Sequence, residues 1–142
     1  MSRRRRPDSS GNGAAARSPD ADAGTRYDRS YFDRFYRGPR RVHSADDQAR
    51  RARMVLVVAE YMLGRPARSV LDVGCGEGEW RGVLRRLRPG LRWVGVDPSE
   101  YVVRRFGARR GIRLGTFAAL DEAGVRGPFD VVVCAGMLNY LT

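Results

Sequence analysis

The feature that most constrains the fold is an apolar run that leads into an acidic residue and three glycines at alternate positions. From position 70 to 78 the chain reads Val-Leu-Asp-Val-Gly-Cys-Gly-Glu-Gly. Because glycine has no Cβ, the backbone can turn tightly there and a ligand can approach the main chain closely. The N–H groups of a helix that follows such a turn point toward that ligand. The pattern therefore predicts a strand, a ligand-binding turn and a helix.

A second acidic residue stands where a second strand is expected to end. The apolar run Trp93-Val94-Gly95-Val96 is followed directly by Asp97. In parallel α/β sheets, a carboxylate at the tip of the second strand is placed to accept hydrogen bonds from ribose hydroxyls. The two segments together predict a mononucleotide-type cofactor at the turn.

The spacing of the glycines discriminates between cofactors. A dinucleotide fingerprint reads G-x-G-x-x-G and leaves room for a pyrophosphate. Here the spacing is G-x-G-x-G, Glu79 stands three residues after Gly76, and Asp72 precedes the first glycine by two. Additional carboxylates repel a pyrophosphate and attract a cation. The motif thus favours a cationic cofactor over a nicotinamide dinucleotide.

With these residues the chain resembles the class I S-adenosylmethionine-dependent methyltransferases. The likeness continues at Phe129-Asp130 and the apolar run up to Cys134, which correspond to the family's fourth strand. It extends over residues 27–142. The alternative is a generic doubly wound domain that has a glycine turn and binds no cofactor.

Alternating helical and strand patterns predict an α/β fold, a Rossmann-like doubly wound parallel sheet with helices on both faces. About four strands are expected, in the order 3-2-1-4, which places the cofactor near the switch point between strands one and four. The expected strands are 69–73, 92–96, 112–114 and 130–134, and the expected helices are 44–63, 78–87 and 98–107. Five aromatic residues on a helical stripe in 27–36 are interpreted as core packing, with a lid over the cofactor as the alternative.

The family fold has about seven strands, so residues 27–142 are expected to be a methyltransferase domain whose C-terminal part is missing. Such a fragment leaves the fourth strand with an open edge, and self-association through that edge is predicted. Residues 1–26 are expected to be a disordered, arginine-rich tail without apolar periodicity.

The resemblance implies a set of cofactor-binding residues around the first two strand tips. Asp72 would act near the cofactor's ammonium group, and Asp97 would hold both ribose hydroxyls. Pro98 would press on the adenine. The backbone from Gly74 to Gly78 would line the methionine moiety, with Gly74, Cys75, Gly76 and Gly78 as its contacts.

The resemblance also implies contacts from the third and fourth strands. Family members often carry a carboxylate for the adenine amino group after strand three, where this chain has Thr116 and Phe117 instead. Cys134 and Ala135 would offer backbone carbonyls to the ammonium group. Asn139 and Tyr140 are candidates for orienting the methyl acceptor, with packing as the alternative, and no catalytic base and no metal ligands are assigned.

Composition limits the choice of partners. The formal charge is +11, yet every basic residue except one histidine is arginine, which points to codon bias and weakens an inference of nucleic-acid binding. Motifs for methylating DNA bases are missing after strand four. No apolar run is long enough to span a membrane. Two cysteines without a disulfide framework or a secretory signal favour a reducing cytoplasm.

The predicted function is S-adenosylmethionine-dependent methyl transfer to an unidentified, small-molecule acceptor. Two other functions stay open. One is a non-catalytic cofactor-binding module that needs a partner chain to supply the missing strands. The other is an arginine-rich nucleic-acid-binding protein that uses the same fold.

Overall fold

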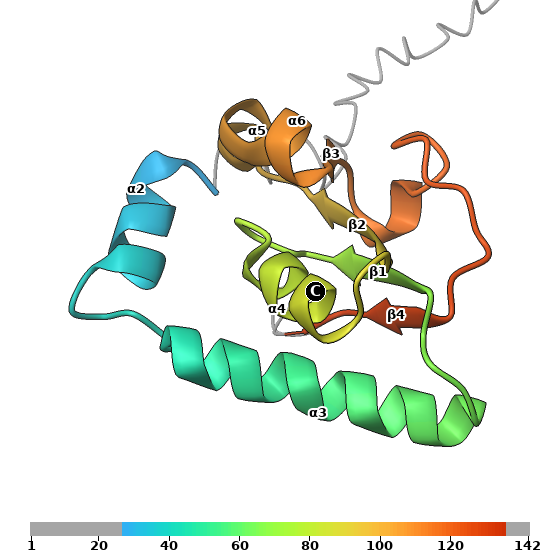
Figure 1. The fold of residues 1–142 in the computed structure, drawn as a ribbon. Coiled ribbons are helices and arrows are strands. Elements are labelled where there is room, and N and C mark those ends of the chain that lie inside the picture. Colours follow the sequence, from blue (N-terminus) through green and yellow to red (C-terminus); the bar gives the residue numbers. More distant parts are fainter. Residues whose placement is uncertain (1–26, 136–142) are drawn as a thin grey trace, which may run out of the picture.

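The computed structural model describes residues 27–135 (Figure 1). Its centre is a parallel sheet of four strands in the order β3-β2-β1-β4. The sheet and its order confirm the sequence prediction, including the position of the fourth strand beside the first. The strands are β1 (Ser69–Val73), β2 (Arg92–Asp97), β3 (Ile112–Leu114) and β4 (Val131–Val133).

The central strand β1 is buried along its whole length. Strands covered on both faces read as continuous apolar runs, which explains the uninterrupted apolar pattern around Asp72. In the register of the sheet, Asp72 lies between Gly95 of β2 and Val133 of β4. An acidic residue is therefore placed inside the sheet itself, close to the carboxyl ends of its strands.

The α-helices pack on one face of the sheet and share its main apolar core. The long helix α3 (Ala45–Leu63) runs beside α4 (Glu79–Leu87), as Figure 1 shows. A third helical stretch consists of α5 (Glu100–Val102), the π-helix η2 (Val103–Gly107) and α6 (Ala108–Arg110). The predicted helices are confirmed, and the third one extends three residues beyond its expected end.

Helix α3 illustrates how local sequence sets the helix ends. The Ser44 hydroxyl accepts a hydrogen bond from the Asp47 backbone N–H at 3.0 Å, which caps the first turn. Gly64 ends the helix with a positive φ of 63°, a conformation that favours glycine. Both residues were expected at these ends from their types alone.

The second face of the sheet is covered differently. The 3-10 helix η3 (Phe117–Ala119) and the irregular chain that follows it pack there against a smaller apolar cluster. Its buried members are Leu71, Val73, Val96 and Val125. Among residues 27–135, this face carries no α-helix.

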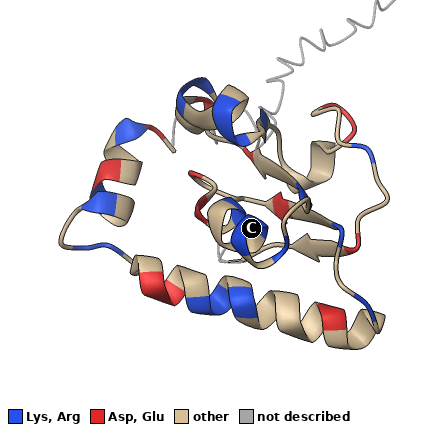
Figure 2. Ribbon diagram, viewed as in Figure 1, with Lys and Arg blue, Asp and Glu red and all other residues tan. Residues whose placement is uncertain are grey.

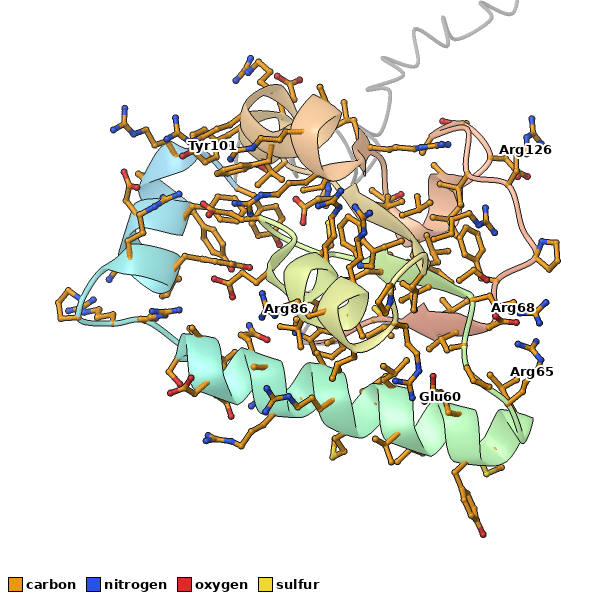
Figure 3. The ribbon with its side chains drawn as sticks, in the orientation of Figure 1. Glu60, Arg65, Arg68, Arg86, Tyr101 and Arg126 are labelled. Carbon is orange, nitrogen blue, oxygen red and sulfur yellow. The ribbon has the colours of Figure 1, made fainter. Side chains whose placement is uncertain are left out.

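The N-terminal aromatic segment folds back onto the helical face. It forms α2 (Arg29–Phe32) and the π-helix η1 (Asp33–Arg37), and Phe32 is buried in the main core. The Phe32 ring centroid lies 4.8 Å from that of Tyr36 and 5.7 Å from that of Tyr101. Figure 3 labels Tyr101 on α5, which faces α2. Phe32 therefore packs in the core as predicted, and Tyr27, Tyr31 and Tyr36 pack against that core while partly exposed.

Asp130 was expected in the fourth strand but lies immediately before β4. There it connects two loops at the amino end of the sheet. Its carboxylate accepts hydrogen bonds from the Arg65 guanidinium at 2.6 Å and from the Arg68 backbone N–H at 2.7 Å. These contacts, Arg65 first, hold the pKa of the Asp130 carboxyl well below its usual range. Figure 3 shows Arg65 and Arg68 at this end.

Strand β4 pairs with β1 alone among the described strands, and the Val132 side chain is 56% exposed. Self-association through this edge stays a prediction. The arginine-rich tail and the residues Asn139 and Tyr140 lie outside the described range. Within that range, no helix has the length and apolarity to cross a membrane, and no cluster of acidic, histidine or cysteine side chains is suited to hold a metal ion.

Candidate functional site

The site is built on the glycine-rich turn at the carboxyl end of β1. Gly74, Gly76 and Gly78 all have positive φ values, of 68°, 53° and 75°. L-residues with a side chain rarely adopt this conformation, so the alternate glycine spacing is required by the backbone itself. Gly78 is also the N-cap of α4, so the turn passes directly into a helix start.

Asp97, at the end of β2, lies beside this turn and is 5% exposed. One carboxylate oxygen accepts the Gly76 N–H at 2.7 Å, and the other accepts the Ser99 N–H at 2.9 Å. Each oxygen keeps a second lone pair for a further donor. Burial raises the pKa of the Asp97 carboxyl to about 6.

A second buried carboxyl group lies behind the turn. Asp72 is 4% exposed, and burial together with the nearby Asp97 raises the pKa of its carboxyl to about 7. Cys75 lies near both carboxyl groups. Burial raises the pKa of the Cys75 thiol, and the charges of these two groups raise it further. A cation bound next to Asp72 would favour the charged carboxylate. The site is thus suited to a cationic group.

A cavity of about 140 Å³ opens at these strand tips, and a smaller one of about 50 Å³ adjoins it. Of the residues predicted for the site, Gly74 and Ala135 line both cavities. Asp97 and Pro98 line only the larger one, whereas Asp72 and Cys75 line only the smaller one. The structure therefore brings residues from β1, β2 and the end of β4 together around connected space.

The other predicted residues within residues 27–135 line neither of these two cavities. Gly76, Thr116 and Phe117 are among them. The Tyr36 hydroxyl covers the position where a Cβ on Gly76 would stand. The Thr116 hydroxyl oxygen is buried and has no hydrogen-bond partner within residues 27–135. Phe117 is 56% exposed. Gly115 N–H donates to the Asp97 carbonyl at 3.2 Å, which holds Thr116 close to the tip of β2.

Sequence reasoning missed the outer wall of the larger cavity. Its polar members come from the loop before α3 and from the first turns of α3 and α4: Arg41, His43, Gln48, Arg51 and Glu79. One signal was available, because His43 is the sole histidine of the chain and stands immediately before the helix cap.

Two polar contacts hold the N-terminal segment in place over the site. The Ser99 hydroxyl donates to the Tyr27 carbonyl, and the Arg37 guanidinium pairs with the Glu77 carboxylate in the glycine turn. Figure 2 shows basic positions of η1 across from acidic positions of this turn. In Figure 1 the arrowheads of β1 and β4 point toward α2. The segment from Tyr27 to Arg37 therefore covers the carboxyl edge of the sheet.

The parallel order β3-β2-β1-β4, the glycine turn and the acidic tip of β2 define the Rossmann-like fold of class I S-adenosylmethionine-dependent methyltransferases. A family model described as a methyltransferase domain matches residues 71–142. The chain belongs to this methyltransferase family.

Two individual proteins are similar to the chain. An uncharacterized protein of Synechococcus sp. is 31% identical over 86 residues, which cover 56% of this chain and 20% of that protein. The crystal structure of the plantazolicin methyltransferase BamL, in complex with a triazolic desmethylPZN analog and SAH, superposes with a TM-score of 0.53 at 18% identity. That match covers 80% of this chain and 44% of BamL, and it supports the fold. The chain spans about a fifth of the first relative and less than half of the second.

Proposed function

We propose that the chain binds S-adenosylmethionine at the carboxyl ends of β1 and β2 and directs its methyl group to a small-molecule acceptor. One observation carries the proposal. Two buried carboxyl groups, on Asp72 and Asp97, flank a turn of three positive-φ glycines that borders a cavity. That arrangement suits a ligand with a ribose and a positive charge, and it suits a pyrophosphate poorly.

The residues present fit this cofactor. Asp97 has lone pairs left for the two ribose hydroxyls, and Asp72 would act near the ammonium group from the smaller cavity. The unpaired, buried hydroxyl of Thr116 beside the tip of β2 fits a contact to the adenine. Pro98 and Phe117 would supply apolar contacts there, and the carbonyls of Cys134 and Ala135 would complete the ammonium site.

When it is bound, the sulfonium cofactor supplies a methyl group that is already electrophilic. The chain's own task is then to align an acceptor with that group, and alignment alone can supply about 7–11 kcal/mol of the barrier. The aromatic side chains of Tyr31, Phe35 and Tyr36 form part of the cavity wall and would exclude water from it. The residues that would orient the acceptor come from the opposite, polar wall.

A small molecule is the acceptor favoured by the cavity. Its aromatic lining suits a compact organic group rather than a polymer backbone. The structural neighbour BamL was crystallised with a triazolic desmethylPZN analog and SAH. Cytoplasmic location and the absence of a nucleic-acid partner remain expectations.

Calorimetry on the full chain tests cofactor binding. We expect S-adenosylmethionine and S-adenosylhomocysteine to bind, and NAD to bind far more weakly. A variant that begins at Tyr27 should bind equally well, because the proposed contacts all lie beyond residue 26. Tight binding of NAD without binding of S-adenosylmethionine would refute the proposal.

A methyl-transfer assay with labelled cofactor and a broad panel of small acceptors separates an enzyme from a non-catalytic cofactor-binding module. Transfer to any member of the panel supports the enzyme. Cofactor binding without transfer, until a second polypeptide is added, supports the module.

A further inference from the structure

The outer wall of the larger cavity contains a histidine–aspartate pair that the cofactor site does not use. The His43 Nδ1 atom lies 2.9 Å from Asp47 Oδ2, and both side chains are 29% exposed. A carboxylate can only accept a hydrogen bond, so Nδ1 is the donor of this pair and Nε2 is the ring nitrogen left for another partner. The pair thus has the geometry of a base and the group that orients it.

Further contacts hold this ring in place from several sides. The Arg41 Nε atom donates to the His43 carbonyl at 2.6 Å. On α3, the Arg51 Nε atom lies 3.0 Å from the same oxygen of Asp47 that binds the imidazole. The Glu79 carboxylate, on α4, lines the same cavity and lies 3.9 Å from the Arg41 guanidinium. The histidine is therefore attached at both its backbone and its ring.

His43 lines the same cavity as Gly74, Asp97 and Pro98. One wall of the cavity is the proposed cofactor side, and the histidine stands on the wall that comes from the loop before α3. A molecule that occupies the space between the two walls contacts both. A base on this wall can contact a bound acceptor, while the proposed cofactor lies on the other wall.

The other ionisable groups of the cavity are less suited to accept a proton. Burial raises the pKa of the Tyr36 phenol, which keeps it protonated as a donor. Asp97 is already engaged by two backbone N–H groups. Glu79 is the exception, because burial raises the pKa of its carboxyl and makes it a stronger base, so it is the remaining rival of His43.

Resting on the proposed function, we propose that His43, oriented by Asp47, removes the proton from the acceptor and that the acceptor is a phenol-type hydroxyl compound. The acceptor O–H proton moves to His43 Nε2, and an oxygen lone pair forms the new O–CH3 bond. The S–CH3 bond breaks, and its electron pair stays on sulfur as the neutral thioether.

The acceptor class follows from the acidity of the possible acceptors and from the aromatic and basic side chains that line the cavity. A neutral amine already has its lone pair, and aliphatic hydroxyls are far weaker acids than a phenol, whose pKa is about 10. Of these acceptors, a phenol is the one whose proton a base must remove and can remove most readily. The rings of Tyr31 and Phe35, with centroids 4.9 Å apart, line the cavity and suit an aromatic acceptor. The guanidinium groups of Arg41 and Arg51 on the same wall favour a developing phenolate.

The first test is nitrogen NMR of the ¹⁵N-labelled full chain at a pH above the imidazole titration. Because the chain has one histidine, one pair of ring nitrogens reports on it directly. We expect the proton on Nδ1, a shift toward the Nε2–H form in Asp47→Asn, and no change in Asp46→Asn. Asp46 is the matched control, an exposed acid in the same helical turn. A proton on Nε2 in the parent, or equal effects of the two variants, overturns the pair.

The second test uses phenol and para-nitrophenol as probes in the presence of S-adenosylhomocysteine. We expect both probes to perturb the imidazole signal and bound para-nitrophenol to be enriched in its coloured anion. His43→Gln should weaken para-nitrophenol binding about tenfold or more, the loss of a charge-assisted hydrogen bond. The pH dependence of the probe's colour should change with it, which a purely structural role would not cause.

Absence of any imidazole response to both probes overturns the acceptor class. A larger loss in Glu79→Gln than in His43→Gln assigns the proton to Glu79 and overturns the role of His43. Calorimetry with S-adenosylhomocysteine is run on each variant, and retained binding shows that the variant is folded. If the parent itself does not bind this cofactor, the proposed function fails, whereas the tautomer test still decides the histidine–aspartate pair.

Discussion

The two walls of the larger cavity are held in place by different forces. On the strand-tip wall, Asp97 is 5% exposed and both of its oxygens are bonded to backbone N–H groups. On the outer wall, the side chains of Arg41 and Arg51 are held by ion pairs with Glu79 and Asp47, and they are 38% and 44% exposed. Backbone hydrogen bonds in a buried sheet are rigid, whereas exposed ion pairs contribute little and are screened by salt. We therefore expect the first wall to select the cofactor and the second to admit and orient the acceptor.

The largest expected effect is the loss of Asp97. Asp97→Ala removes a carboxylate proposed to hold two ribose hydroxyls, with charge-assisted bonds of about 1.5–3 kcal/mol each. Cofactor affinity measured by calorimetry should fall roughly 10- to 1000-fold, since water replaces part of the interaction. Glu100→Ala is the control, because that carboxylate is exposed and near in sequence. Unchanged affinity in Asp97→Ala would show that the strand-tip wall does not anchor the ribose.

The next effect concerns the pH dependence of stability without cofactor. The pKa of Asp72 rises from 3.8 to about 7 and that of Asp97 to about 6. Between about pH 4 and pH 7, the folded state keeps protons that the unfolded chain has lost, so the free energy of unfolding falls as pH rises. Asp72→Asn should flatten this fall and stabilise the cofactor-free chain above pH 7, on the order of a few kcal/mol.

Urea unfolding at a series of pH values measures this effect. Asp121→Asn, at an exposed position, is the control and should leave the pH dependence intact. If Asp72→Asn and Asp121→Asn give the same profile, the pKa of Asp72 is the same in the folded and unfolded chains, and burial does not raise it.

A third effect concerns Gly76, where the Tyr36 side chain lies against the glycine turn. Its positive φ makes Gly76→Ala cost about 1–2 kcal/mol of unfolding free energy. The added Cβ also meets the Tyr36 hydroxyl, and overpacking costs about 1–3 kcal/mol more. Gly64→Ala is the matched control, since it has a similar φ of 63° and no atom within 4 Å of the added Cβ. Equal losses in the two variants would mean that Tyr36 moves aside freely.

The smallest effect is expected for the ion pair that attaches the N-terminal segment. Arg37→Ala should lower the free energy of unfolding by at most about 1 kcal/mol, because the pair is partly exposed. Dissociation of S-adenosylhomocysteine, followed by stopped flow, should become faster, more so at low salt than at high salt. Arg40→Ala, a nearby exposed arginine, serves as the control. A change as large as that of Asp97→Ala would erase the distinction between the walls.

The strand-tip wall could be predicted from the sequence because its determinants are local. Alternate glycines require a positive φ, an apolar run with no polar alternation indicates a buried strand, and Asp97 follows such a run directly. Each of these depends on residues within a few positions of one another. The order of the four strands, by contrast, was implied by the resemblance to the methyltransferase family.

The outer wall was decided only by the tertiary structure. His43, Arg51 and Glu79 are separated by 8 and 28 positions along the chain, and they share one cavity because α3 docks against α4. No periodicity records such a docking, since it depends on how two apolar faces fit together. The same holds for the Tyr36 hydroxyl over Gly76 and for the buried surroundings that raise the pKa of Asp72. The sequence by itself determined a glycine turn with an acidic strand tip, and packing over long separations decided which side chains face it.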